Sequence, residues 1–463
     1  MSNNQIKNIV LITVALGAFL IPFMGTSLSI ALPPIGIEFS LDAVFLSWIS
    51  TAFILANAAL ILPFGRIADI YGRKKIFTYG ILIYTFSSFL GAVSLSGNLL
   101  LISSFLQGIG CSMIFGTGVA LLSSVFNPEE RGKSYGIYVG AVYAGIFSGL
   151  LIGGFLIQNF GWRTIFIFNV PIGIFILSLL FTKIKSEWKG CKGERFDFIG
   201  SILFIIIIVT LLQGFSTIVT ETYGKYLLLI GLLTIFIFLK YENSYSDPLI
   251  TLSIFKNPLF TISVLSLLII NVGTSSMNYL LSLYFQYLKL LPPNTAGLIL
   301  VLQPIFVALI SPIAGRISDK YDPRLFTSTG MLITTIGLFI LIFLNQDTPF
   351  YSIILGLILI GIGVALFASP ATNAAMSTVN KKFYGVASAT VSTMVFGGQL
   401  LSMAVVILIF AFYLGNVQII PQYYPLFIKS ANIAFIVYTA VCFIAIFALL
   451  LMGRNRSISN EKE

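Results

Sequence analysis

The sequence predicts an all-α polytopic membrane protein with fourteen transmembrane helices, arranged as two six-helix bundles with two helices inserted between them. The first observation is composition: 57% of the 463 residues are hydrophobic and only 9% are charged, and the mean hydropathy is +1.01. That is more apolar surface than a soluble core can bury. The second is that the apolar residues form charge-free runs of about 20 residues, the length that crosses a bilayer.

A charged turn at residues 65–75 provides the third observation, because its pattern occurs twice. The order Gly-Arg-Ile-x-Asp-x-Tyr at 65–71 recurs at 315–321, an offset of 250 residues (315 minus 65). We infer two halves that descend from one ancestral unit. The charges of the first copy are Arg66, Asp69, Arg73, Lys74 and Lys75.

Charged or turn-forming breaks divide the chain into the fourteen spans. The first run is too long for a signal-peptide core, so we read it as a retained span. The eighth is charge-free only over 226–239, which also suits a buried or re-entrant helix. We read it as a crossing because the basic segments 183–195 and 316–324 then lie on one side. The predicted spans are 9–32, 44–65, 76–95, 99–126, 134–160, 164–182, 197–219, 223–241, 258–288, 290–315, 325–346, 349–380, 383–413 and 427–452.

The basic residues indicate the orientation of these spans. With the amino terminus in the cytoplasm, 22 of the 26 Lys and Arg residues (26 minus 4) lie inside, and Arg163, Lys225, Lys289 and Lys429 lie outside. This asymmetry follows the positive-inside rule, so both termini and the linker around Cys191 are expected to face the cytoplasm. The net charge of +10 then reflects topology in a multi-pass cell-membrane protein and not nucleic-acid binding.

The position of the second charged turn indicates the domain organisation. It lies later than a direct six-span repeat would place it, so two spans are inserted between the halves. We expect an N-terminal six-helix bundle over 1–195, two inserted helices with their linkers over 196–257, and a C-terminal six-helix bundle with a short cytoplasmic tail over 258–463. The expected partners are the bilayer and a lipophilic substrate, and the expected state is a monomer.

Histidine and cysteine usage argues against several kinds of chemistry. The chain has no His and three Cys residues, Cys111, Cys191 and Cys442, which form no disulfide framework of the secreted kind. The commonest transition-metal ligand and the usual general base are therefore missing. We expect no metal site, no cofactor and no enzymatic activity.

Several motifs resemble those of the major facilitator superfamily, in its fourteen-span drug:proton antiporter branch. The charged turn matches the superfamily's cytoplasmic signature between spans two and three, and Pro128–Lys133 matches the following cytoplasmic turn. Leu106–Gly110 resembles the fourth-span signature, Gly145–Gly154 the fifth-span antiporter motif, and Gly161–Gly173 the opening of span six. The resemblance covers nearly the whole chain and implies the major facilitator fold.

We read the charged turn as a gate latch. Gly65 and Gly72 would let two helix ends approach closely, and Asp69 can accept hydrogen bonds from a neighbouring helix terminus or pair with Arg73 or Arg131. The alternative is a solvated positive-inside turn, although topology requires bases and no acid. The repeat counterpart of Asp69 is Asp319.

Four glycines form one helical stripe in the fifth predicted span: Gly145, Gly149, Gly153 and Gly154. Small residues at this spacing let helices pack closely. We expect them at the interface between the two bundles, where they would let the fifth span slide on its partner.

Two residues depart from the antiporter branch. Met24 stands where the first-span motif has an acid, and Ser104 stands where the fourth-span motif has arginine. All sixteen acids lie at or beyond predicted span ends, so we expect no carboxylate at the membrane midplane. Proton coupling would then depend on acids near span ends, such as Glu38, Asp42 and Asp69, or on a titratable substrate, and is expected to be weak.

The remaining candidates for substrate contact are neutral, and an apolar, aromatic-rich cavity with scattered amides suits hydrophobic neutral or weakly cationic ligands. Multidrug efflux is the leading interpretation. A facilitator or metabolite exporter with weak or no proton coupling, and a sensor that does not transport, are the alternatives, and movement of a lipophilic dye across vesicles would separate them. The cavity candidates are Met24, Asn57, Gln107, Tyr143, Asn278, Tyr279 and Gln303.

Overall fold

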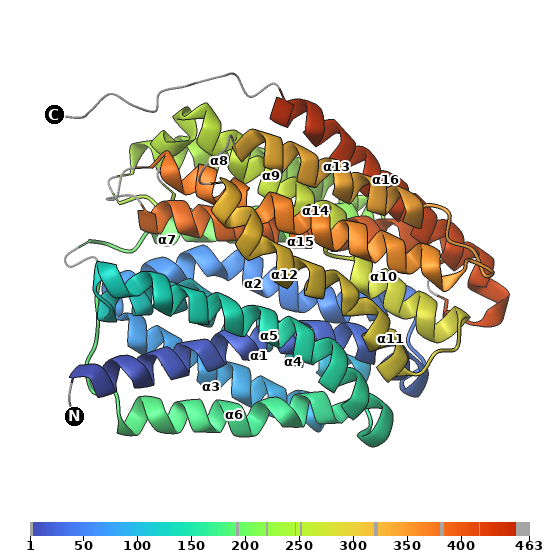
Figure 1. Ribbon diagram of the computed structural model, residues 1–463, viewed down its shortest axis with the longest axis horizontal. Coiled ribbons are helices and arrows are strands. Elements are labelled where there is room, and N and C mark those ends of the chain that lie inside the picture. The colour runs from blue at the N-terminus through green and yellow to red at the C-terminus, as the bar shows by residue number, and fades with distance from the viewer. Residues whose placement is uncertain are drawn as a thin grey trace.

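The computed structural model describes residues 3–190, 194–218, 221–245, 247–250, 252–318, 323–379, 384–415 and 417–450. Helices make up most of these ranges, and long helices run along the length of the molecule (Figure 1). Such helices satisfy their own backbone hydrogen bonds, which a hydrocarbon environment requires.

The first six helices form the part of the chain that we call the first half. They are α1 (Asn3–Glu38), α2 (Ala43–Tyr71), α3 (Arg73–Ala92), α4 (Gly97–Val125), α5 (Pro128–Phe160) and α6 (Arg163–Thr182). Two further helices, the inserted pair, are α7 (Phe198–Thr217) and α8 (Tyr223–Ser244).

The second half contains the remaining elements. It begins with the 3₁₀ helix η1 (Leu252–Lys256), α9 (Pro258–Thr274), α10 (Met277–Leu283) and the π-helical η2 (Tyr284–Leu288). It continues with α11 (Pro293–Leu300), α12 (Leu302–Ser318), α13 (Pro323–Leu341), α14 (Phe350–Ser377), α15 (Tyr384–Tyr413), the 3₁₀ helix η4 (Pro421–Tyr423) and α16 (Tyr424–Leu450).

Twelve helices in the described part of the chain are long and apolar enough to cross a membrane. The other two predicted spans correspond to α3 and α13. α3 begins with three basic residues and carries several hydroxyl side chains, and the apolar part of α13, Leu325–Leu341, is shorter than the other twelve. The ninth predicted span, 258–288, is divided into α9, α10 and η2, and the tenth is divided into α11 and α12.

Each half packs within itself. In the first half α1 packs against α5, and α4 lies between α2 and α3. In the second half α14 packs against α12 and α13, while α9 packs against α15 (Figure 1). The halves meet where α2 contacts α15 and where α5 contacts α11.

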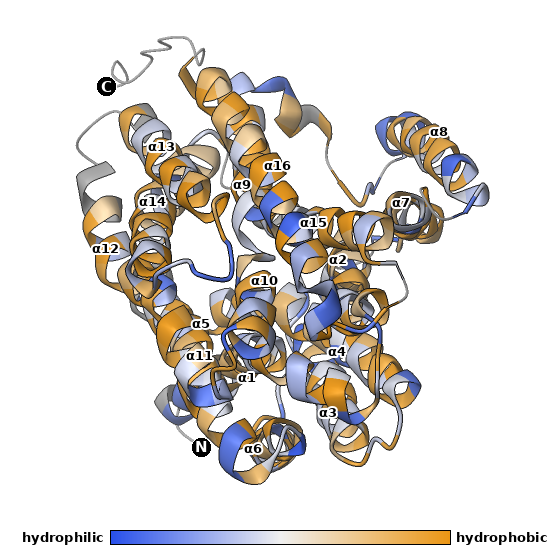
Figure 2. Cartoon of the chain, turned by 90° about the vertical axis from the view of Figure 1, so that its right-hand side faces the viewer, coloured by the Kyte–Doolittle hydropathy of each residue, from blue (hydrophilic) through white to orange (hydrophobic). Residues whose placement is uncertain are grey.

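The inserted pair lies beside this junction. α7 contacts both α2 and α15, whereas α8 packs mainly on α7 and stands at the periphery (Figure 2). In the described part of the chain the pair thus touches both halves mainly through α7, and α8 adds a contact with η1.

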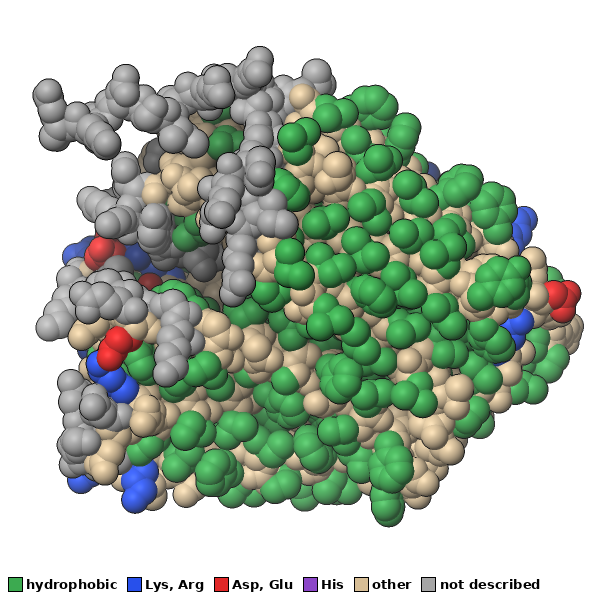
Figure 3. All heavy atoms as spheres, in the orientation of Figure 1, with side chains coloured by type: hydrophobic (Ala, Val, Ile, Leu, Met, Phe, Trp, Pro, Cys, Tyr) green, Lys and Arg blue, Asp and Glu red, His purple; other side chains and the backbone are tan. Residues whose placement is uncertain are grey.

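The molecular surface has the distribution expected in a bilayer. On the face shown in Figure 3, hydrophobic side chains cover the middle and charged side chains gather towards two opposite ends. Large apolar side chains are exposed on peripheral helices, including Phe181 at 64% and Phe236 at 71%. Lipid contact explains such exposure, which water would penalise.

Candidate functional site

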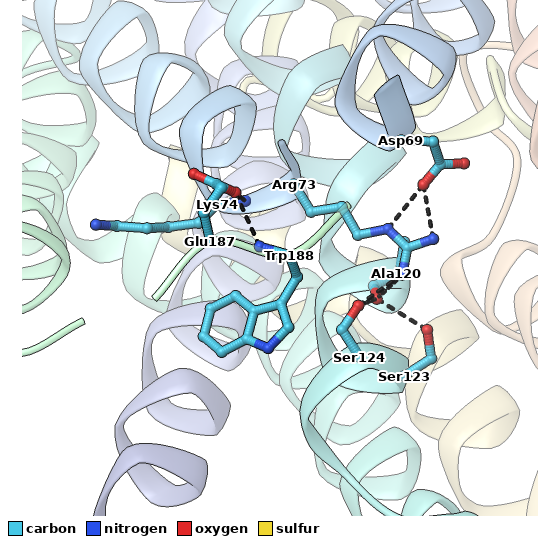
Figure 4. Close-up of polar contacts among 8 residues, drawn as sticks. All are labelled: Asp69, Arg73, Lys74, Ala120, Ser123, Ser124, Glu187 and Trp188. Carbon is cyan, nitrogen blue, oxygen red and sulfur yellow. Dashed lines mark hydrogen bonds and ion pairs between the residues drawn. The ribbon is translucent and has the colours of Figure 1, made fainter. Parts of the chain in front are cut away.

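The charged turn is held by an ion pair that spans the junction of α2 and α3 (Figure 4). The Arg73 guanidinium lies 2.7 Å from Asp69 Oδ1. The same guanidinium donates to the Ala120 carbonyl at 2.9 Å and to Ser124 Oγ at 2.6 Å on α4. Asp69 therefore orients Arg73 towards the end of α4, and the connection stays within the first half.

The linker that follows α6 crosses the same turn. The Arg73 amide donates to the Trp188 carbonyl at 2.8 Å, and the Gly190 amide donates to the Asp69 carbonyl at 3.0 Å. Glu187 accepts from the Lys74 amide at 2.9 Å (Figure 4). Gly72 has φ of +138°, and a Cβ there would lie 2.6 Å from Glu187, so the position requires glycine.

Two further ion pairs lie at this end of the molecule, which we call the turn end. Arg66 pairs with Glu194 at 2.5 Å, and Lys7 pairs with Glu130 at 2.5 Å. The hydrogen bond from Lys7 holds the pKa of Glu130 below its usual range. Arg73, and not Arg131, is thus the described partner of Asp69; the side chain of Arg131 and all of Asp319 lie outside the described residues.

Gly65 has a close neighbour on α4. A Cβ at Gly65 would lie 3.6 Å from the Gly116 carbonyl oxygen, which is ordinary contact. The tighter contact is at Gly116 on α4, because a Cβ there would lie 3.1 Å from the Ile61 carbonyl oxygen on α2. Gly65 and Gly116 therefore allow α2 and α4 to pack closely near the turn.

At the opposite end of the molecule, which we call the far end, hydrogen bonds to backbone carbonyl groups join the two halves. The Ala43 amide donates to the Val417 carbonyl at 3.1 Å. Gln418 Nε2 donates to the Ser40 carbonyl at 2.8 Å. The end of α1 and the start of α2 are in this way attached to the segment after α15.

Side chains of the α10–η2 region add three more contacts at or towards the far end. Gln286 Nε2 donates to the Ile30 carbonyl at 3.0 Å, and the Tyr287 hydroxyl donates to the Pro33 carbonyl at 3.1 Å. The Tyr279 hydroxyl lies 2.7 Å from Ser47 Oγ in a buried contact. Sequence reasoning missed this cluster except for Tyr279, because no motif marks it.

Three of the four stripe glycines lie elsewhere than expected. A Cβ at Gly145 or Gly149 would overlap α1 backbone atoms, and one at Gly153 would overlap Ser27 on α1. Only Gly154 faces the second half, where its Cβ would lie 2.9 Å from the Pro293 carbonyl. The expected interface position is therefore wrong for the first three, because the α1–α5 contact lies within one half.

Met24, Gln107 and Asn57 are buried in the interior of the first half. Asn169 Nδ2 lies 3.3 Å from Met24 Sδ, and Gln107 Nε2 donates to Ser88 Oγ at 2.9 Å. In the described part of the chain, Gln107 Oε1, Ser104 Oγ and both amide atoms of Asn57 have no hydrogen-bond partner. These neutral groups retain unused hydrogen-bonding capacity.

The other cavity candidates come from different helices. Tyr143 on α5 forms a side-chain hydrogen bond with Ser311 on α12, so it connects the halves. Tyr279 is buried and its hydroxyl is hydrogen-bonded to Ser47, while Asn278 and Gln303 are half-buried. Asn278 Oδ1 has no partner among the described residues. The structure therefore does not bring the seven candidates into one cluster.

No group of three or more His, Cys, Asp or Glu residues that could hold a metal ion occurs in the part of the chain that the structure describes. The polar groups include ion pairs at the turn end, the Arg163–Glu38 ion pair where α1 ends and α6 begins, hydrogen bonds between the halves at the far end, and neutral side chains in the interior. Two packed helical halves with an apolar outer surface define the class of polytopic membrane transporters.

Comparisons with known proteins identify the family. The family described as "Major Facilitator Superfamily" matches residues 14–292 and 264–463. The chain belongs to this superfamily of membrane transporters, which also agrees with the expectation of transport rather than catalysis.

Individual relatives differ in their substrates. The chain is 30% identical to the riboflavin transporter RibZ of Clostridioides difficile (strain 630), over 98% of this chain and 99% of that protein. It is 26% identical to the multidrug resistance protein Stp of Mycobacterium tuberculosis (strain CDC 1551 / Oshkosh), over 87% and 75%. The fold is similar to that of the POT family transporter PepTSo, with a TM-score of 0.70, 15% identity and coverage of 97% and 98%.

Proposed function

We propose that this transporter exports hydrophobic, neutral or weakly cationic compounds by alternating access, with a polyspecific multidrug exporter as the leading candidate. The observation that carries the proposal is the neutral interior. Asn57, Ser104, Gln107 and Asn278 offer unpaired polar atoms inside an apolar helical protein. Such an interior favours uncharged ligands with aromatic surface and a few hydrogen-bonding groups.

The contacts between halves support alternating access. The hydrogen bonds of Ser40, Ala43 and Ser47 with the second half lie towards the far end, away from the charged turn. With the charged turn in the cytoplasm, as the positive-inside asymmetry favours, the described conformation is closed towards the outside. Transport then requires these contacts to break and reform.

A second candidate is a carrier for riboflavin or a similar neutral heteroaromatic compound. It is favoured by the 30% identity with the riboflavin transporter over nearly the full length of both proteins. Such a carrier would run as a facilitator with weak or no proton coupling, because Met24 and Ser104 replace the charged residues of the antiporter branch. Both candidates share the chemistry of a neutral aromatic ligand.

The finer architecture belongs to the same proposal. We infer fourteen crossings, with α3 and α13 completing the twelve more apolar helices, and domains over 1–195, 196–257 and 258–463. The protein would act as a monomer in the cell membrane with both termini in the cytoplasm. Antiport with protons, if present, would use Glu38 and Asp42 at the far end or Asp69 at the turn end.

A transport panel tests the proposal. Purified protein in vesicles is supplied with neutral lipophilic dyes, lipophilic cations and riboflavin, and protein-dependent movement of each is measured. Preference for several dyes supports the multidrug exporter, and riboflavin alone supports the second candidate. Movement of none of these compounds would contradict both.

An imposed pH difference at clamped voltage tests the coupling. We expect little uphill accumulation of a non-titratable substrate. Strong accumulation that survives neutralisation of Glu38 and Asp42 would contradict weak coupling and would require another proton path.

A further inference from the structure

Two carboxyl groups are buried together where the inserted pair begins and ends. Asp197 is the N-cap of α7: its Oδ1 accepts from the Gly200 amide at 2.8 Å and from the Tyr241 hydroxyl at 3.1 Å. Glu242 lies near the end of α8, and its Oε2 accepts from the Ile250 amide at 3.1 Å. Asp197 is 0% exposed and Glu242 is 2% exposed.

The second oxygen of each carboxyl group has no donor. Asp197 Oδ2 and Glu242 Oε1 are both buried and unpartnered within the described residues. A Cβ at Gly200 would overlap Asp197 Oδ2 and would lie 2.6 Å from Glu242 Oε1. Both oxygens therefore occupy the space that a missing side chain at Gly200 leaves open, and the two carboxyl groups are within side-chain hydrogen-bonding distance.

Two ionised carboxylates in such a place would repel one another without water to screen them. One proton placed between them turns the two unpartnered acceptors into a donor and an acceptor, so both oxygens are satisfied. We propose that Asp197 and Glu242 form a proton-binding site that holds one shared proton when the inserted pair is packed as in this structure.

None of the described ion pairs brings a basic side chain to either carboxyl group, so we assign the neutralising charge to the shared proton. α8 contributes Tyr241 and the exposed Lys240, followed by Tyr245. Arg195 lies in the linker before α7, and Asp247 lies in the loop after α8. The Arg195 amide donates to Asp247 Oδ2 at 3.4 Å. α15 carries no charged residue, η1 carries the exposed Lys256, and Arg66 of α2 pairs with Glu194. The four described ion pairs include neither Asp197 nor Glu242.

The site couples proton binding to the packing of the inserted pair against the rest of the protein. Glu242 accepts a hydrogen bond from the Ile250 amide. Leu249 and Ile250 pack in one apolar cluster with Ile61 and Leu62 of α2. Loss of the proton would force the carboxyl groups apart and loosen this segment, which leads into η1 and α9. The folded protein then holds one more proton than the unfolded chain near neutral pH, so its stability falls as pH rises.

Amide substitutions test this directly, because Asp197→Asn and Glu242→Gln each supply a permanent N–H where the shared proton lies. Purified protein in detergent is melted across a pH series that brackets neutrality. In the wild type the unfolding equilibrium constant is expected to rise about tenfold per pH unit from this one proton. The two variants should lack this pH dependence, whereas Glu221→Gln, an exposed carboxyl-to-amide change between α7 and α8, should keep it. Variants with the wild-type slope would overturn the proposal.

A spectroscopic measurement on the wild type covers the case in which the variants fail to fold. Infrared spectra at neutral pH should contain the C=O band of a buried protonated carboxylic acid, and that band should disappear in alkali. Its absence would overturn the assignment. Stabilisation of the wild type by added Na⁺ or Ca²⁺ with no pH dependence would also overturn it, because the site would then hold a cation in place of the proton.

Discussion

At the scale of single residues, the charged turn shows why an acid stands in a segment whose topology requires only bases. Asp69 is 29% exposed in its side chain, and its partner Arg73 is 17% exposed. The carboxylate fixes the guanidinium, which then reaches Ala120 and Ser124 on α4. The turn is therefore an ordered junction of α2, α3, α4 and the linker, and a bare basic surface would not need the acid.

Asp69→Asn is expected to reduce transport roughly fivefold, equivalent to about 1 kcal/mol, because the amide loses the charge-assisted bond to Arg73. Expression should change little, since the residue does not form part of the core. Rates are compared at equal protein levels in vesicles, with Asp347→Asn as an exposed control at the far end. A fully active Asp69→Asn protein would return the turn to a purely topological role; Asp319, its repeat counterpart, is expected to matter less.

Tyr279→Phe is expected to favour the conformation that is open at the far end. The change removes one buried hydrogen bond between the halves, worth about 1 kcal/mol, and so shifts the closed-to-open ratio about fivefold. Accessibility of a cysteine introduced near the far end measures this. Tyr84→Phe is the matched control, because its hydroxyl bonds to Leu20 within the first half. Equal accessibility in the two variants would contradict the assigned role of Tyr279.

At the scale of helices, the α1–α5 contact depends on small residues. A Cβ at Gly149 would overlap Thr26 Oγ1, while one at Gly140 on the same helix would meet nothing within 4 Å. Gly149→Ala should cost about 1–3 kcal/mol of stability through overpacking. Gly140→Ala should be neutral or slightly stabilising, because alanine favours helix. Melting temperatures compare the two variants, and equal values would mean that α5 shifts freely on α1.

Hydropathy and charge predicted most of the helices because each depends on a local run of residues. The runs at 9–32 and 44–65 correspond to α1 and α2, and even the short eighth run forms the helix α8. The break between α9 and α10 was missed, since the polar residues there are uncharged and lie inside a charge-free run. Composition also could not show which face of α5 meets α1 and which meets α11.

The candidate site was less predictable for a related reason. Asp69 and Arg73 are near neighbours in sequence, so their pairing could be anticipated. Asp197 and Glu242 were placed correctly at span ends, but their burial depends on how α8 packs against α7 and on the space at Gly200. Tyr279 was assigned to a cavity, although its hydroxyl bonds to Ser47 across the halves. Such contacts arise only from tertiary packing.

At the scale of the whole molecule, orientation in the membrane is open to a labelling test. We expect Cys191 to react with a membrane-impermeant thiol reagent in inside-out vesicles and not in intact cells, because the linker around it is rich in basic residues. Cys111 and Cys442 are buried and should contribute little background. Cys191→Ser provides the control, and labelling of Cys191 in intact cells would reverse the proposed orientation.

The account as a whole depends on opening at the far end, so a reversible cross-link there tests it most directly. Ala43→Cys and Val417→Cys are combined in a protein otherwise free of cysteine, since the two backbones are hydrogen-bonded at 3.1 Å. Transport of a neutral compound identified by the panel is measured in vesicles before oxidation, after oxidation and after reduction. We predict that oxidation abolishes transport and that reduction restores it. Undiminished transport by the cross-linked protein would contradict alternating access through this end.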